Sequence, residues 1–145
     1  MLSVVVDAQR APERLAGMLA QLTPLAVAGL VREVVVATPR GHGGAEALCE
    51  ATGALIEGDL TTALQRTRAD WLLLLPAELR LRDGWVERLQ DALARGPRPA
   101  RLVGMKPGAF RPAPRGVLVR RAEALAQPDL HRLGRRLGLA ALRIG

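Results

Sequence analysis

Residues 71–75 read Trp-Leu-Leu-Leu-Leu, an unbroken apolar run. A strand with one face in water alternates polar and apolar side chains, whereas an unbroken run is typical of a central strand that is covered on both faces. Strands of that kind occur in parallel sheets that lie between layers of helices. The run therefore predicts an α/β fold.

Other short β-branched or apolar stretches on both sides of this run are expected to be strands. They lie at residues 3–6, 33–37, 54–57, 102–103 and 116–119, with a last edge strand at 142–144. Helical patterns separate the first four strands, and short connections join strand to helix. This alternation predicts a mainly parallel sheet flanked by helices.

Local signals place the helices. Pro12 suits a first helical turn, Asp59 suits an N-cap, and Trp85 opens an amphipathic pattern after Gly84. A basic helix is expected to begin after Asp129 and to reach about residue 137. Helices are therefore expected after most of the strands.

The length and composition predict one domain, because 145 residues that are 49% hydrophobic can bury one sizeable core. Cys49 is the single cysteine, which excludes a disulfide framework and a cysteine-built zinc site, and it is expected to be a small buried residue. The first residues do not resemble a signal peptide, and no apolar run is long enough to span a membrane. We expect a reduced, cytoplasmic protein, peripheral to a membrane if its basic part binds one.

The positive charge lies at the C-terminal end. Residues 1–100 contain 11 basic and 12 acidic side chains, whereas residues 101–145 contain 10 basic and 2 acidic ones. Such a region attracts phosphate groups or an anionic membrane surface. Nucleic acid is disfavoured because the chain has two Trp, one Phe and no Tyr with which to stack bases. Twenty of the 21 basic residues are Arg, so GC-rich coding is an alternative explanation of the charge.

Three loops are expected to meet at one edge of the sheet, because ligands of open parallel sheets bind outside the carboxyl ends of the strands. The loops are 7–10, 38–44 and 76–79. Backbone amides of the glycine-rich 40–44 segment can approach a phosphate, although glycines also serve ordinary turns. The candidate ligand contacts are Asp7, Arg10, Thr38, Arg40, His42, Gly43 and Glu78. The alternative for Asp7 is a loop carboxylate paired with an arginine.

Five stretches resemble, in order, the nucleotide-binding half of inverting family 2 glycosyltransferases. They read Ser-Val-Val-Val and Pro-Glu-Arg-Leu at 3–6 and 12–15, Glu-Val-Val-Val at 33–36, Ala-Asp-Trp-Leu-Leu-Leu at 69–74, and Gly-Trp-Val at 84–86. The resemblance implies a Rossmann-like GT-A fold. We therefore expect a single truncated GT-A-like domain over residues 1–145, with a nucleotide-binding half at 1–93 and a reduced, basic acceptor-side half at 94–145.

This resemblance also implies a site. Family members bind a nucleotide-diphosphate sugar, hold a divalent metal with an Asp-x-Asp motif, and use a carboxylate base on the acceptor. Here the second strand ends at Thr38 where the family has a uridine-contacting Asp, and Pro76-Ala77-Glu78 stands at the Asp-x-Asp position. Glu78 is then the implied ligand of Mn²⁺ or Mg²⁺, and Asp129 the implied catalytic base. The alternative for Asp129 is an N-cap of the basic helix.

The sequence thus supports two main hypotheses. The first is a glycosyltransferase-like protein that binds a nucleotide-diphosphate sugar and transfers the sugar to an acceptor. The second is a catalytically inactive relative that acts as a binding or protein-interaction module, as a homodimer or beside an anionic membrane. Five arginines of the basic part are candidates for holding a pyrophosphate or pressing on a bilayer: Arg120, Arg121, Arg132, Arg135 and Arg136.

Overall fold

The structure is a computed structural model that describes residues 1–39, 43–106, 108, 110, 113–127, 132 and 142–144. Within these residues one seven-stranded sheet has the order β3-β2-β1-β4-β6-β5-β7. The strands are β1 (Leu2–Asp7), β2 (Val31–Ala37), β3 (Leu55–Glu57), β4 (Trp71–Pro76), β5 (Ala100–Val103), β6 (Arg115–Arg120) and β7 (Leu142–Ile144). β6 is antiparallel to both of its neighbours, and the other pairs are parallel. The prediction of an α/β fold with a mainly parallel sheet is confirmed.

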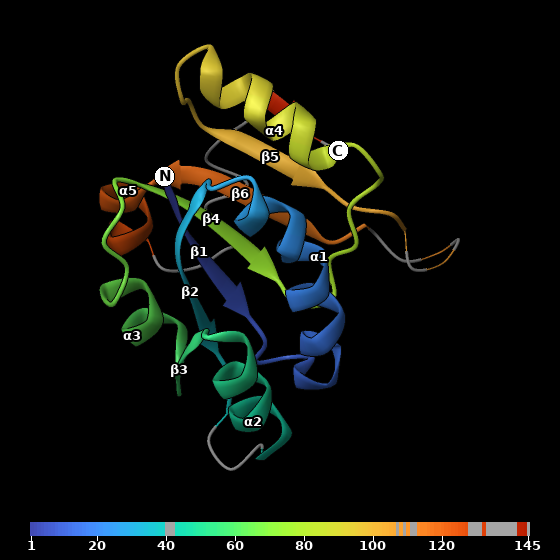
Figure 1. Cartoon of the computed structure of the whole chain (residues 1–145), viewed down its shortest axis with the longest axis vertical. Helices are drawn as coiled ribbons and strands as arrows, with labels where there is room; N and C mark the ends of the chain where they lie inside the picture. The colour runs from blue at the N-terminus through green and yellow to red at the C-terminus, as the bar shows by residue number, and fades with distance from the viewer. Residues whose placement is uncertain are drawn as a thin grey trace.

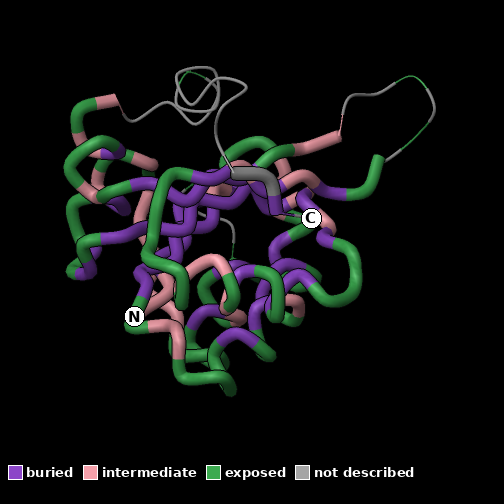
Figure 2. Tube along the Cα trace, turned by 90° about the horizontal axis from the view of Figure 1, so that it is seen from above, coloured by how far each residue is buried: buried purple, intermediate pink, exposed green. Residues whose placement is uncertain are grey.

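Helices cover both faces of the sheet (Figure 1). The described helices are η1 (Pro12–Arg14), α1 (Leu15–Val27), α2 (Gly43–Thr52), α3 (Leu60–Gln65), α4 (Trp85–Ala94) and α5 (Arg121–Ala126). Buried side chains of α1, α2 and α4 form the core on one face, and those of α3 and α5 form the core on the other. Figure 2 shows the buried segments in the middle of the molecule and the exposed ones outside.

β4 is the central strand that its sequence predicts. All six of its residues are buried, and Leu72 to Leu75 have no exposed surface. Leu73 and Leu75 pack in the cluster with α1, while Leu72 and Leu74 pack in the cluster with α3. Apolar side chains are therefore needed at every position of this strand.

The residues predicted to begin helices, Asp59 and Pro12, lie at helix starts in the structure. Asp59 caps α3, since its Oδ1 accepts the Thr62 backbone N–H at 2.7 Å. Pro12 occupies the first turn of η1, which leads directly into α1. Cys49 is buried, and burial raises the pKa of its thiol. No helix in the described part of the chain has the length and apolar character of a membrane span.

The C-terminal third contains a helix that the sequence analysis did not predict. α5 follows β6 at once, and the Arg121 backbone N–H donates to the Asp70 carbonyl at 2.7 Å. Its six residues bury only Ala124 fully, so they show too little apolar periodicity to be recognised. The helix expected after Asp129 lies outside the described residues, apart from Arg132.

Candidate functional site

The first four strands end at a common edge of the sheet. The register pairs Asp7 with Ala37 on one side and with Pro76 on the other, and Ala37 with Glu57. Backbone hydrogen bonds continue past the strand ends: Ala77 N–H donates to the Asp7 carbonyl at 2.9 Å and Thr38 N–H to the Glu57 carbonyl at 3.0 Å. The loops that follow the strands therefore start from fixed positions.

A cavity of about 230 Å³ opens beside this edge. Its lining comes from the ends of β2 and β3 and from the first turn of α2: Thr38, Pro39, Glu46, Ile56, Glu57 and Gly58. Thr38 is only 2% exposed, and its Oγ1 has no hydrogen-bond partner among the described residues. Leaving a buried hydroxyl unpaired costs about 1–3 kcal/mol. The hydroxyl therefore has a hydrogen-bonding capacity that the described residues leave unused.

The two glutamates of the cavity differ in their ion pairing. Glu57 Oε1 lies 2.8 Å from Arg66 Nη1, an ion pair between the end of β3 and the end of α3. Glu46 is exposed in the first turn of α2 and makes no ion pair within the described part of the chain. The carboxylate of Glu46 is thus the freer of the two.

The loop after β1 lies next to the cavity. Asp7 is half-buried, and its Oδ1 accepts the Gln9 backbone N–H at 3.2 Å, which stabilises the turn. Gln9 Nε2 donates across to the Gly58 carbonyl at 3.4 Å. Arg10 is exposed. The alternative reading of Asp7 as the partner of an arginine is not seen among the described residues.

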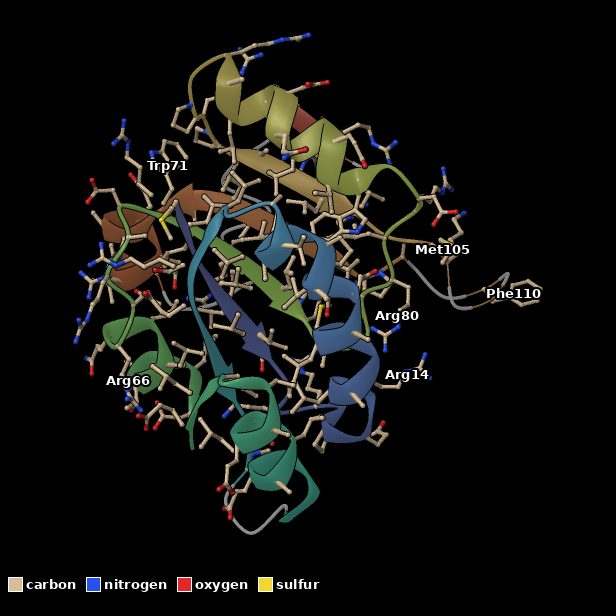
Figure 3. The ribbon with its side chains drawn as sticks, viewed as in Figure 1. Arg14, Arg66, Trp71, Arg80, Met105 and Phe110 are labelled. Carbon is tan, nitrogen blue, oxygen red and sulfur yellow. The ribbon has the colours of Figure 1, made fainter. Side chains whose placement is uncertain are left out.

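Arg80 organises the loop after β4. Its Nη1 donates to the carbonyls of Ala77 and Leu79, both at 2.8 Å, and its Nη2 donates to the Arg14 carbonyl at 3.0 Å. Figure 3 shows Arg80 beside the start of α1. Burial lowers the pKa of Arg80, and the nearby charge of Arg14 lowers it further, while Glu78 acts in the opposite direction. The β4–α4 loop is therefore tied to α1 beside Glu78.

The described residues at this edge do not offer the set of ligands that a divalent cation prefers. Pro76 and Ala77 are buried and lack side-chain oxygens, so Glu78 is the one carboxylate at the Asp-x-Asp position. Across the described residues, no three His, Cys, Asp or Glu side chains are grouped as a metal site. Hard cations such as Mg²⁺ prefer several oxygen ligands. Glu78 and its described neighbours therefore supply too few oxygen ligands to hold such an ion.

The predicted site residues are partly brought together. Asp7 ends β1, Thr38 follows β2 and Glu78 follows β4 at the carboxyl edge. Gly43 is the first residue of α2, whose Glu46 lines the cavity with Thr38. Arg40, His42 and Asp129 lie outside the described residues. Sequence reasoning missed Glu46 and two further polar cavity positions, Glu57 and Gly58. The end of the third strand could have indicated those two by the same carboxyl-edge rule, whereas Glu46 gives no signal of its own.

The pyrophosphate role considered for Arg120 and Arg121 is wrong for a ligand at this edge. Arg120 pairs with Trp71 at the start of β4, the opposite end of the sheet from Glu78, and its guanidinium lies 4.9 Å from the Trp71 ring centroid. Arg121 donates to Thr67 Oγ1 at 3.0 Å and to the Gln65 carbonyl at 3.2 Å. Because β6 runs antiparallel to β4, its last residues lie away from the carboxyl edge.

Comparisons by sequence find no matching family model and no similar curated protein. Comparison by structure finds many similar proteins. Mannosyl-3-phosphoglycerate synthase from Rubrobacter xylanophilus has a TM-score of 0.58 and 17% identity, covering 76% of this chain and 43% of the synthase. Glucosyl-3-phosphoglycerate synthase from Mycobacterium tuberculosis was solved with Mn²⁺, UDP and glucosyl-3-phosphoglycerate. Its TM-score is 0.56 and its identity is 22%, and the match covers 98% of this chain and 53% of the synthase.

The third similar structure is 4-diphosphocytidyl-2C-methyl-D-erythritol synthase from Anaerococcus prevotii. Its TM-score is 0.66 at 7% identity, over 99% of this chain and 87% of the synthase. The chain thus spans about half the length of the two sugar-transferring synthases and most of the length of the third. Together with the strand order and the two helical layers, these similarities show that the chain has a GT-A-like α/β fold.

Proposed function

We propose that the chain binds a nucleoside diphosphate, as part of a nucleotide-diphosphate sugar, at the carboxyl edge of the sheet. The observation that carries this proposal is the cavity at Thr38, with its buried and unpartnered hydroxyl. At about 230 Å³ it is smaller than the roughly 300–1,000 Å³ of sites for whole drug-sized ligands. A cavity of this size suits one ring system, so we propose that it holds the nucleobase of the nucleotide.

The diphosphate then lies outside the cavity, along the loops after β1 and β2. Arg10 is exposed in the first loop, and the backbone N–H groups at the start of α2, near Gly43, form the positive end of the helix dipole. Both favour an anion. We propose that these groups, rather than a metal ion, offset the phosphate charge.

The proposed transfer step uses an acceptor hydroxyl. Its oxygen attacks the anomeric carbon while Asp129 takes its proton, and the bond between that carbon and the diphosphate oxygen breaks. The nucleoside diphosphate leaves with the bonding electrons. A charged carboxylate is suited to such general-base work, which typically contributes 10²–10⁴-fold in rate. Transfer and binding are separate proposals, because the Thr38 cavity supports the binding alone.

Thr38→Val is the sharpest test of the binding site. In calorimetric titrations with GDP, UDP and their sugar conjugates, the wild type is expected to bind at least one of them, with the same affinity in Mn²⁺ and in EDTA. The variant is expected to bind about tenfold more weakly, because it loses a buried hydrogen bond to the ligand. The unliganded variant should unfold at the same or a slightly higher temperature, because the unpaired hydroxyl is gone.

Thr61→Val, at an exposed position of α3, is the control. Equal affinity of all three proteins would contradict the proposal.

A second candidate function, an interaction module at a membrane, is favoured by one surface feature. Phe110 is fully exposed and Met105 is 48% exposed, and both lie on the same side of the molecule, with Phe110 projecting outward (Figure 3). The Met105 backbone N–H donates to the Arg80 carbonyl at 2.7 Å, which places Met105 beside the β4–α4 loop. Exposed Lys106 and Arg115 flank it. Apolar side chains among cations match an anionic lipid surface.

Vesicle sedimentation tests this second function. The wild type is expected to pellet with phosphatidylglycerol vesicles and to remain in solution with phosphatidylcholine vesicles. Met105→Ser combined with Phe110→Ser should lower the bound fraction at least about threefold, because less apolar surface enters the lipid. Val27→Ser, at another exposed apolar residue, is the control and should bind as the wild type does. Equal pelleting of the two serine variants would refute a role for this segment.

A further inference from the structure

The Thr38 cavity has a lining that accepts hydrogen bonds. Among the residues that the structure describes, the lining includes two glutamates and no Lys, Arg or His. Thr38 adds a hydroxyl, which can either donate or accept. A ligand that fits this lining must present N–H donors to the carboxylates.

Glu46 is the carboxylate available for such donors. Glu57 is already paired with Arg66 at 2.8 Å. Glu46 has no ion pair among the described residues, and α2 holds its backbone next to the ends of β2 and β3. A carboxylate has two oxygens and can accept two parallel hydrogen bonds from adjacent donors. The carboxylate of Glu46 thus matches a ligand edge that has two neighbouring N–H groups.

We propose that the base recognised by this cavity is guanine, an inference that rests on the proposed nucleotide-binding function. Guanine presents the ring N1–H and the 2-amino group side by side, which match the two oxygens of Glu46. Its O6 accepts a hydrogen bond from the Thr38 hydroxyl. The donor and acceptor capacities of these two side chains are then used together.

Uracil is the base that fits least. Its N3–H lies between two carbonyl oxygens, so a carboxylate that approaches this donor is repelled by an acceptor on either side. Selectivity of this kind comes from unfavourable contacts with the wrong ligand as well as favourable contacts with the right one. Cytosine and adenine, which each have one amino group beside an acceptor nitrogen, fall between guanine and uracil.

The test is a calorimetric comparison of GDP, ADP, CDP and UDP on the full chain. The wild type is expected to bind GDP at least about tenfold more tightly than UDP. Glu46→Gln replaces a carboxylate with two acceptor oxygens by an amide with one acceptor oxygen and one N–H donor group. The amide can accept only one of the two hydrogen bonds from guanine, so GDP affinity should fall about tenfold, while UDP affinity should stay the same or rise. Glu50→Gln lies on the same helix, is exposed and does not line the cavity, so it should leave all four affinities unchanged.

The outcomes separate this inference from the proposed function. If no nucleotide binds, both fail. If nucleotides bind but GDP and UDP differ by less than about twofold, or if Glu46→Gln weakens all four equally, nucleotide binding stands and guanine recognition by Glu46 is overturned. Selective loss of GDP binding in Glu46→Gln, with Glu50→Gln unchanged, supports the inference.

Discussion

Leu73→Ala is expected to lower the free energy of unfolding by about 2–5 kcal/mol, the usual range for removing a fully buried leucine side chain. Leu73 has no exposed surface and stands in the middle of β4, between β1 and β6. It packs in the cluster that joins the sheet to α1 and α4. Because strands lie on both sides and helices above, the surrounding chain cannot close the space that the lost atoms leave.

Thermal and denaturant unfolding measure this effect. A domain of this size has a total stability of about 5–15 kcal/mol, so the loss should lower the melting temperature by on the order of 10 °C. Val27→Ala is the control because Val27 is 82% exposed at the end of α1, and it should change stability by less than about 0.5 kcal/mol. If the two variants were equally stable, β4 would not be the centre of the core.

Arg80→Ala is the second large effect, expected at about 2–3 kcal/mol in stability, with weaker nucleotide binding besides. The guanidinium holds three backbone carbonyls from two places, the β4–α4 loop and the end of η1. Hydrogen bonds to charged groups contribute about 1.5–3 kcal/mol each, but Arg80 is only partly buried, so water recovers part of the loss. Lysine cannot replace it, because one ammonium group cannot span all three acceptors.

The space around Arg80 offers an independent variant. A Cβ at Gly17 would overlap Arg80 Nη2 and lie 3.0 Å from its Cζ, so Gly17→Ala must displace the guanidinium. We expect it to reproduce part of the Arg80→Ala loss, about 1 kcal/mol, although alanine is the better helix former. Arg82→Ala, at a neighbouring exposed arginine, should be silent in the same unfolding and binding assays. A silent Arg80→Ala would show that the other contacts of the loop, which include two hydrogen bonds with the Gln21 side chain, are enough to position it.

Much of the first half of the fold was predictable because its signals are local. The leucine run of 71–75 predicts β4, and the carboxylate of Asp59 predicts the start of α3, since each depends only on neighbouring residues. The carboxyl-edge rule then places Asp7, Thr38 and Glu78 together, because parallel strands end on the same side. The sequence could not indicate α5, whose short amphipathic pattern is weak.

The candidate site was only half predictable. Thr38 was expected there as the replacement for an acid. That its hydroxyl has no hydrogen-bond partner among the described residues depends on how the ends of β2 and β3 and the first turn of α2 come together. Glu46 contributes to the cavity for the same reason. Arg120 and Arg121 show the reverse case, since their charge suggested an anion site and the antiparallel direction of β6 carries them to the far end of the sheet.

The sequence by itself determined most of the strands and helices, though not α5, and that β4 is buried on both faces, because the spacing and apolarity of neighbouring side chains express those properties directly. Only the tertiary structure decided that β6 lies between β4 and β5, and which polar groups line a cavity at the carboxyl edge. The physical reason is that strand neighbours and cavities arise from contacts between residues far apart in the chain. The unpartnered hydroxyl of Thr38 and the carboxylate of Glu46 acquire their chemical meaning only when those distant segments have packed.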